Sequence, residues 1–249
     1  MIAALGMYDL GDAAPANDRL WALIRDGLGG AGMAAPQALT RGDLAYLPGW
    51  LSPDLVLAQT CGRPFREMLH DKVALIGTPD YGLPGCAPGY YRSVFVVRAD
   101  DPRGALGDFA SARFAYNDPM SQSGWAGPMH HAPYLTPALQ TGGHRASAQA
   151  VAEGAADVAA LDAVTWGLLQ RNLPELAAQL RVVDETPPAP GLPLISAQGS
   201  DAARIFSVVA GAIAALSAGD RAALSLQGLV QIPVSAYLAL PPAAPAPKL

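Results

Sequence analysis

Short apolar runs alternate with helix-forming stretches along this chain, and the alternation restricts the fold more than any other feature of the sequence. Residues 55–59 read as a buried strand, and residues 90–98, rich in β-branched and aromatic side chains, are the strongest strand candidate. A helix is predicted from Ser200 and Asp201, which can cap it, to about residue 215. Strands that alternate with helices are typical of α/β proteins. We therefore expect mixed, mostly parallel sheets flanked by helices.

The chain of 249 residues is long enough for two lobes, and its punctuation indicates where they divide. Hydrophobic residues make up 51% of the sequence, which supplies one or two full cores. Stretches rich in Gly, Pro or polar residues mark residues 90–98 and 186–194 as hinges. We expect the first lobe to comprise residues 1–92 and 193–249, and the second to comprise residues 93–192. Two crossing segments are typical of a hinged molecule whose cleft closes on a ligand.

Charge and hydropathy argue against two classes of partner. The net charge is −5 and no block of basic residues occurs, so we expect no nucleic-acid binding. No apolar stretch reaches the roughly 18 residues of a membrane-spanning helix, so we expect no membrane insertion. The N-terminal residues lack the basic region and long apolar stretch of a signal peptide. We therefore expect the chain as written to be cytoplasmic, and periplasmic if a leader has been removed.

Metal and thiol chemistry find little support in the sequence. The cysteines, Cys61 and Cys86, form no C-x-x-C pair, and whether they pair with each other is left open. His130 and His131 are adjacent but have no further ligands at metal-binding spacing. The sequence also has no Ser-His-Asp order and no G-x-x-x-x-G-K phosphate loop. We expect no metal, no cofactor and no enzymatic activity.

Residues 113–124 have the pattern of an anion site. Residues 113–116 read as the end of a strand, a polar turn follows, and Ser121, Gln122 and Ser123 open a helix. The first turn of a helix has unpaired backbone N–H groups, and the helix dipole makes that end positive. Together with serine hydroxyls, these donors can hold an oxyanion. The alternative is that the serines only cap the helix.

Other candidate ligand-binding residues stand where strands end. Gln59 and Thr60 close the second strand, Tyr8 follows the first strand, and Asp162 follows a strand at residues 157–161. Clefts of α/β proteins receive ligands at the carboxyl ends of strands. Asp162 has the alternative role of capping the next helix, and Tyr8 has the alternative role of core packing.

Five phrases of the sequence share their order and spacing with one protein family, over about residues 8 to 200. They are Leu57-Ala-Gln-Thr-Cys-Gly-Arg-Pro-Phe65, Tyr91-Arg-Ser-Val-Phe-Val-Val-Arg98, Tyr116-Asn-Asp-Pro-Met-Ser-Gln-Ser-Gly124, Gly142-Gly-His-Arg-Ala-Ser147 with Val151-Ala-Glu-Gly-Ala-Ala-Asp-Val158, and Thr186-Pro-Pro-Ala-Pro-Gly-Leu-Pro193. On these phrases the chain resembles the substrate-binding proteins of phosphate/phosphonate-type ABC transporters. The resemblance implies the two-lobed type 2 periplasmic-binding-protein fold and a solute-binding function.

The resemblance also implies roles for particular residues. In the family, a hydroxyl-bearing helix start after an N-D-P-x-S-x-S-G phrase holds the anionic head of the ligand, which here corresponds to Ser121, Gln122 and Ser123. A histidine at the next helix start falls on His144, and an aromatic residue near the first strand falls on Tyr8. Gln122 stands where phosphonate binders tend to have a second small hydroxyl residue.

From these features we expect a monomeric, non-enzymatic protein that closes its cleft on a small oxyanion or zwitterion. A phosphate or phosphonate is the expected ligand, and an ABC permease is the expected partner. The alternative is a cytoplasmic enzyme or sensor on the same fold, acting on a small metabolite such as a thiamine-pyrimidine precursor. A regulatory binding module would carry a DNA-binding domain, for which 249 residues leave no room.

Overall fold

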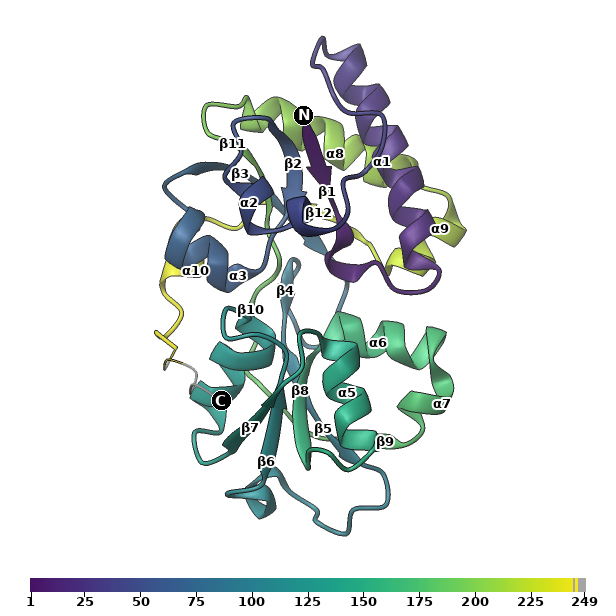
Figure 1. Ribbon diagram of the computed structural model, residues 1–249. Coiled ribbons are helices and arrows are strands. Elements are labelled where there is room, and N and C mark those ends of the chain that lie inside the picture. The colour runs from purple at the N-terminus through teal and green to yellow at the C-terminus, as the bar shows by residue number, and fades with distance from the viewer. Residues whose placement is uncertain (244, 246–249) are drawn as a thin grey trace. The chain divides into compact units, whose positions relative to one another are not determined.

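The computed structural model describes residues 1–243 and 245, and its contacts divide the chain into two compact units (Figure 1). The first unit comprises Met1–Tyr90 and Pro190–Ala239, and the second comprises Tyr91–Ala189 and the chain from Leu240 onward. Each unit contains a five-stranded sheet with helices on both sides.

The sheet of the first unit is mixed, with the strand order β1-β2-β11-β3-β12. Its strands are β1 (Ile2–Ala4), β2 (Leu55–Gln59), β3 (Val73–Asp80), β11 (Leu194–Ala197) and β12 (Gly228–Val230). β1 and β2 are parallel, whereas β11 is antiparallel to both β2 and β3, and β12 is antiparallel to β3. The predicted strand at residues 55–59 is therefore the second strand of this sheet.

Helices cover the two faces of the first sheet. They are η1 (Gly6–Tyr8), α1 (Ala13–Gly30), η2 (Asp43–Ala45), α2 (Leu47–Trp50), α3 (Gly62–Pro64), η3 (Phe65–Leu69), α8 (Ala202–Ala215), α9 (Ala218–Leu224) and α10 (Val234–Leu238). In Figure 1, α1, α8 and α9 lie on one side of the sheet and α2, α3 and α10 on the other. α1 approaches α8 closely at Gly27, where a Cβ would lie 2.8 Å from Val208 Cγ1.

No single helix of the described residues has the length and apolarity needed to cross a membrane. α8 and α9 meet that test only as a pair, and they are bent by 113° relative to each other.

The sheet of the second unit is also mixed, with the order β7-β6-β8-β5-β9. Its strands are β5 (Ser93–Arg98), β6 (Arg113–Tyr116), β7 (Thr136–Gln140), β8 (Val158–Asp162) and β9 (Leu180–Glu185). β6 is parallel to β7 and β8, and β5 is antiparallel to β8 and β9. Its helical segments are η4 (Leu106–Phe109), η5 (Gln122–Ala126), α4 (Gly127–His131), α5 (His144–Ala152), α6 (Ala163–Asn172) and α7 (Pro174–Ala177).

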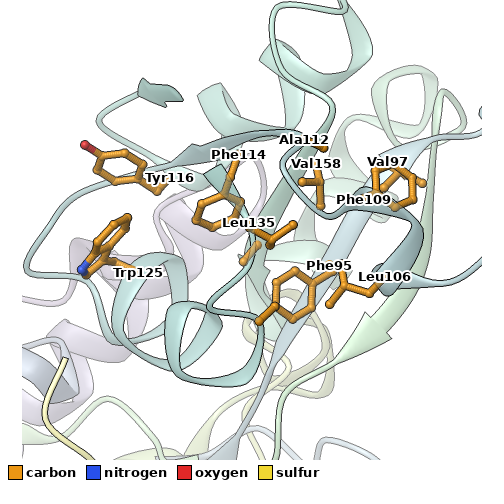
Figure 2. Close-up of a cluster of buried hydrophobic side chains, with 12 residues drawn as sticks. Phe95, Val97, Leu106, Phe109, Ala112, Phe114, Tyr116, Trp125, Leu135 and Val158 are labelled. Atoms are coloured by element: carbon orange, nitrogen blue, oxygen red, sulfur yellow. The ribbon is translucent and has the colours of Figure 1, made fainter. Parts of the chain in front are cut away.

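A cluster of buried apolar side chains forms the core of the second unit on the η5 and α4 side of the sheet (Figure 2). It includes Phe95 and Phe114 from the strands and Trp125 from η5, all at most 1% exposed. Tyr116 and Trp125 lie side by side at one end of the cluster, with 4.7 Å between ring centroids. The packing of Trp125 against Tyr116 therefore fixes the start of η5 on the core of the second unit.

The prediction that most neighbouring strands are parallel is wrong for both sheets. One of the four strand pairs in the first sheet is parallel, and two of the four in the second. The cause lies in the crossing segments. β5 begins where the chain enters the second unit and β9 ends where it leaves, so the two neighbours run in opposite directions. β11 likewise starts where the chain re-enters the first unit, beside the end of β3. The α/β class itself is confirmed.

Two of the crossings between the units pair with each other. β4 (Tyr90–Tyr91) and β10 (Ala189–Pro190) form a two-stranded sheet. Gly89, just before β4, has a φ of +76°, and Gly191 N donates to Gly89 O at 2.8 Å. A Cβ on Gly191 would lie 2.6 Å from that carbonyl oxygen, so glycine is required for the close approach. From sequence the boundaries fall after residues 92 and 192, and the contacts place them after Tyr90 and Ala189.

The chain crosses a third time, which the sequence does not predict. Leu240–Ala243 group with the second unit, although residues 193–249 were expected to belong wholly to the first lobe. The reason is that Ala243 packs against the core cluster of the second unit. The chain therefore passes between the units three times, and not twice as the sequence predicts. Residues 244 and 246–249, which the same expectation included, lie outside the described residues.

Candidate functional site

The predicted strand–turn–helix occurs at residues 113–131. β6 ends at Tyr116, and Ser121 is the N-cap of η5, which continues directly into α4. Ser121 Oγ accepts a hydrogen bond from Gly124 N at 2.9 Å, and Ser121 N donates to Asp118 O at 3.0 Å. Ser121 therefore caps the helix, which was the alternative to ligand binding. Because it satisfies only one donor of the first turn, capping and ligand binding are compatible.

Three segments of the second unit converge at this helix start. His144 opens α5, and its Nε2 lies 3.0 Å from Ser123 Oγ and 3.4 Å from Asn117 Nδ2. Asn117 packs directly onto Gly124, where a Cβ would lie 1.8 Å from Asn117 Oδ1. Two residues of the predicted site, Ser123 and His144, are therefore in hydrogen-bond contact, and Asn117 joins them although it was not predicted as a site residue.

A hydrogen-bond network fixes the position of His144. Thr141 N donates to Tyr116 O at 2.9 Å, and Gly142 N donates to Asn117 O at 2.8 Å. Thr141 Oγ1 lies 2.7 Å from Ser147 Oγ, one turn into α5. These bonds tie the segment that leads into α5 to the end of β6 and so hold the imidazole opposite Ser123.

Burial makes the His144 imidazole a neutral group. Desolvation lowers the pKa of His144 from 6.5 to about 4, and the backbone carbonyl of Ala160 opposes this shift only in part. At neutral pH the ring therefore has a single proton, and its Nε2 faces Ser123 and Asn117. The site offers hydroxyls, backbone N–H groups and a neutral imidazole to a ligand, and these dipoles can hold an anion without a formal positive charge.

The depressed pKa of His144 predicts a pH dependence of stability. Between pH 6.5 and about 4 the unfolded state binds a proton at this residue and the folded state does not. The contribution of neutral His144 to the free energy of unfolding is therefore complete above pH 6.5, and it is lost as the pH falls toward 4. We expect His144→Gln to flatten the fall in the free energy of unfolding over this range, measured by urea unfolding of both proteins at several pH values. An unchanged slope would show that His144 titrates normally in the folded protein.

The predicted site residues of the first unit lie around an aromatic pair. Tyr8, in η1, packs edge-on against Tyr81 with 5.1 Å between ring centroids. Gln59 Nε2 donates to Tyr81 Oη at 2.9 Å, and Thr60, which is fully buried, donates its N–H to Pro193 O at 3.0 Å. The structure thus brings Tyr8 and Gln59 together through Tyr81, a residue that was not predicted as part of the site.

Tyr8, Gln59 and Tyr81 also line a small cavity in the first unit. Its volume is about 30 Å³, and its other walls are mostly apolar side chains of α1, α8 and the segment after α9. Asn17 of α1 is also in this lining, and its Nδ2 donates to Asp9 Oδ1 at 2.6 Å, next to Tyr8. The cavity has room for about one water molecule.

Asp162 caps the helix that follows it, which was the alternative to ligand binding. It is 2% exposed, and its Oδ1 accepts hydrogen bonds from Val164 N at 2.7 Å and Thr165 N at 3.3 Å. These bonds cap α6 at the end of β8. Its carboxylate therefore already satisfies two orphan donors of the helix.

Gln122 differs from the two serines beside it. Its side chain lines a separate cavity of about 400 Å³ in the second unit, together with Gly127, His130 and His131. A Cβ on Gly127 would lie 3.6 Å from Gln122 Nε2, so the side chain runs along its own helix toward the C-terminal end. At the helix start, Ser121 accepts a hydrogen bond from Gly124 N and Ser123 contacts His144, whereas Gln122 lines this separate cavity.

Cys61 is buried and Cys86 half-buried, and they form no disulfide bond with each other, so the pairing left open by the sequence is not formed. His131 Nε2 lies 3.0 Å from Asp184 Oδ2, and among the described residues no group of three or more His, Cys, Asp or Glu side chains is arranged to hold a metal ion.

Comparison with known proteins tests the fold and the resemblance. Residues 57–232 match the family described as ABC transporter, phosphonate, periplasmic substrate-binding protein. No curated protein sequence matches the chain.

Solved structures share the fold at low sequence identity. PhnD1 from Prochlorococcus marinus (MIT 9301), in complex with methylphosphonate, has a TM-score of 0.72 and 16% identity, over 95% of this chain and 94% of that one. XAC2383 from Xanthomonas citri, bound to ATP, has a TM-score of 0.69 and 18% identity, over 96% and 94%. A binding protein component of an ABC phosphonate transporter (PA3383) from Pseudomonas aeruginosa has a TM-score of 0.63 and 21% identity, over 85% and 75%.

These similarities confirm the resemblance predicted from the sequence and the two-lobed periplasmic-binding-protein fold. The matched segment begins within β2 and ends after β12, so it includes strands of both units. The chain therefore belongs to the family of periplasmic substrate-binding proteins of phosphonate ABC transporters.

Proposed function

We propose that the protein captures a small phosphonate-like oxyanion or zwitterion and presents it to its permease. Members of the family are substrate-binding components of ABC transporters, so a small ligand and a permease partner follow from the membership. A phosphonate as that ligand, action as a monomer, and a periplasmic location are parts of the proposal. We propose no catalytic step, because the family binds and hands over its solute.

The contact between Ser123 and His144 carries this proposal. Two segments far apart in the sequence place a hydroxyl and a neutral imidazole 3.0 Å apart at the start of a helix. The helix end contributes unpaired N–H groups and the positive end of its dipole. A tetrahedral oxyanion with three oxygens can accept hydrogen bonds from several such donors at once.

The remaining predicted residues receive proposed roles that follow their contacts. Ser121 and the backbone of Gln122 would complete the donors at the helix start. Tyr8, Gln59 and Thr60 of the first unit would contact the same ligand when the protein closes, with Tyr81 holding the Gln59 amide. Asp162 would meet an amino or hydroxyl group on the ligand through its carboxylate, while it also caps α6.

Calorimetric titration with methylphosphonate, phosphate and methanesulfonate tests the proposal. We expect stoichiometric binding of methylphosphonate without turnover. Ser123→Ala and His144→Ala should each weaken it about 10- to 100-fold, because each removes a group that would hydrogen-bond the ligand. Thr136→Ala, on the exposed face of β7, is the matched control and should bind like the parent protein. If neither variant loses affinity while the control behaves normally, the ligand is held elsewhere.

A further inference from the structure

The short segment between α10 and the second unit is fixed at both of its ends. In the first unit it starts from α10, whose Tyr237 is fully buried. The Tyr237 hydroxyl lies 2.6 Å from Thr78 Oγ1, and its ring packs edge-on against Phe65 with 4.9 Å between centroids. α10 is therefore a firm anchor for the chain that follows it.

The other end of the segment packs onto the second unit. Leu240 and Pro241 line the cavity of about 400 Å³ that also contains Gln122. Ala243 packs against the core cluster to which Phe95 and Trp125 belong. The third connection is thus a covalent link between two packed anchors.

Within each unit, this segment is anchored beside the other two crossings. In the first unit, Thr78 is the partner of Tyr237 and also lies against the glycines that flank the crossings. A Cβ would approach Thr78 to 3.6 Å from Gly89 and to 3.3 Å from Gly191. In the second unit, the cavity lined by Leu240 and Pro241 is also lined by residues 91–93 and 186–189, the two ends of the main segment.

The length of the segment limits what the hinge can do. Four residue steps separate Ala239 from Ala243, and an extended chain spans at most about 14 Å over that distance. Two paired strands such as β4 and β10 permit both bending and twisting, whereas a third short connection alongside them resists twisting and separation. This limit follows from chain length and is independent of how far the protein has opened.

We propose that residues 239–243 act as a third hinge segment, which restricts the opening of the protein to a bend and thereby keeps the ligand-free state close to the binding geometry. The inference rests on the proposed function, because a hinge matters only if the units open and close around a ligand. A restricted open state has less conformational freedom to lose on binding, which raises the affinity for the ligand.

Lengthening the segment tests the proposal. Six Gly and Ser residues inserted between Ala239 and Leu240 add up to about 20 Å of slack and leave both anchors in place. Spin labels at Asp26→Cys and Asp100→Cys, whose side chains are 68% and 72% exposed, report the distance between units by pulsed EPR, with Cys61→Ser and Cys86→Ser in the background. We expect a broader ligand-free distance distribution and an affinity for methylphosphonate about threefold lower.

The matched control has the same six residues appended after Leu249, which leaves the length of the segment unchanged. Its distance distribution and affinity should equal those of the labelled parent. Identical distributions in the insertion variant and the control would overturn the third hinge segment. Because the distances are measured without ligand, they test whether residues 239–243 restrict opening even if methylphosphonate does not bind and the proposed function is wrong.

Discussion

Replacing Gly124 with alanine should weaken methylphosphonate binding about 100-fold. The new Cβ would lie 1.8 Å from Asn117 Oδ1 and 2.6 Å from Asn117 Cγ, so the whole amide has to swing away. Asn117 then loses its contact with His144 Nε2, and overpacking of this kind costs about 1–3 kcal/mol. Because the clash displaces a side chain that contacts His144 at the helix start, we expect calorimetric titration to show this loss of affinity.

Gly127→Ala is the matched control, three residues further along the same helix. A Cβ there would meet Gln122 O at 3.2 Å, which requires a shift of only a few tenths of an ångström. Alanine also favours a helix over glycine by about 1 kcal/mol. We expect Gly127→Ala to retain the parent affinity. Equal losses in the two variants would mean that the contact between Asn117 and Gly124 has no special place in the site.

Removing the Trp125 side chain should be the most destabilising change in the second unit. Trp125 is 1% exposed, packs against Tyr116, and belongs to the cluster around Phe95 and Phe114 (Figure 2). Truncating a buried aromatic residue leaves a large cavity and costs about 3–5 kcal/mol. We expect Trp125→Ala to lower the free energy of unfolding in urea by that amount. The same change should weaken ligand binding, since Trp125 also supports the start of η5.

Tyr134→Ala provides the control for this truncation, because Tyr134 is an aromatic residue of the same unit that is 43% exposed. Its loss should change the free energy of unfolding by about 0.5 kcal/mol or less. A comparable effect from both substitutions would contradict the placement of Trp125 in the core.

The candidate site was predictable where it depended on local backbone structure. Asn117-Asp118-Pro119 ends a strand and Ser121 can cap a helix, so the helix start at residues 121–124 follows from turn and capping chemistry. His144 was reached through the resemblance, since it is 21 residues from Ser123 and no local signal marks their contact. The direction of the Gln122 side chain depends on which face of the helix is buried, and the sequence of four polar or small residues does not define that face.

Tyr81 and Asn117 were missed for a related reason. Each is a polar residue in an irregular segment, and each owes its place to a partner distant in sequence. Tyr81 holds Gln59, 22 residues away, and Asn117 holds His144, 27 residues away. Periodicity describes how one element faces its neighbours, but it does not describe pairs of loop residues.

The strands were predictable where their residues form a continuous apolar run and were missed where the run is short or interrupted. β2, β5 and β8 have continuous apolar runs because both faces of the sheet are covered. β7 is an edge strand in which Pro137 and alternating exposed residues hide the pattern, and β12 has only three residues. Their positions depend on pairing with β6 and β3, which is a property of the assembled sheet.

The crossings between the units set an order in which the two sheets can be completed. Residues up to 189 include every strand of the second sheet, so this sheet can form before the rest of the chain has joined the first unit. The first sheet then lacks β11, which belongs in its middle between β2 and β3, and the two halves have unpaired edges facing each other. Such edges pair readily with other chains. The first sheet is therefore complete only after residues 190–239 have joined it, and its inner edges stay unpaired until then.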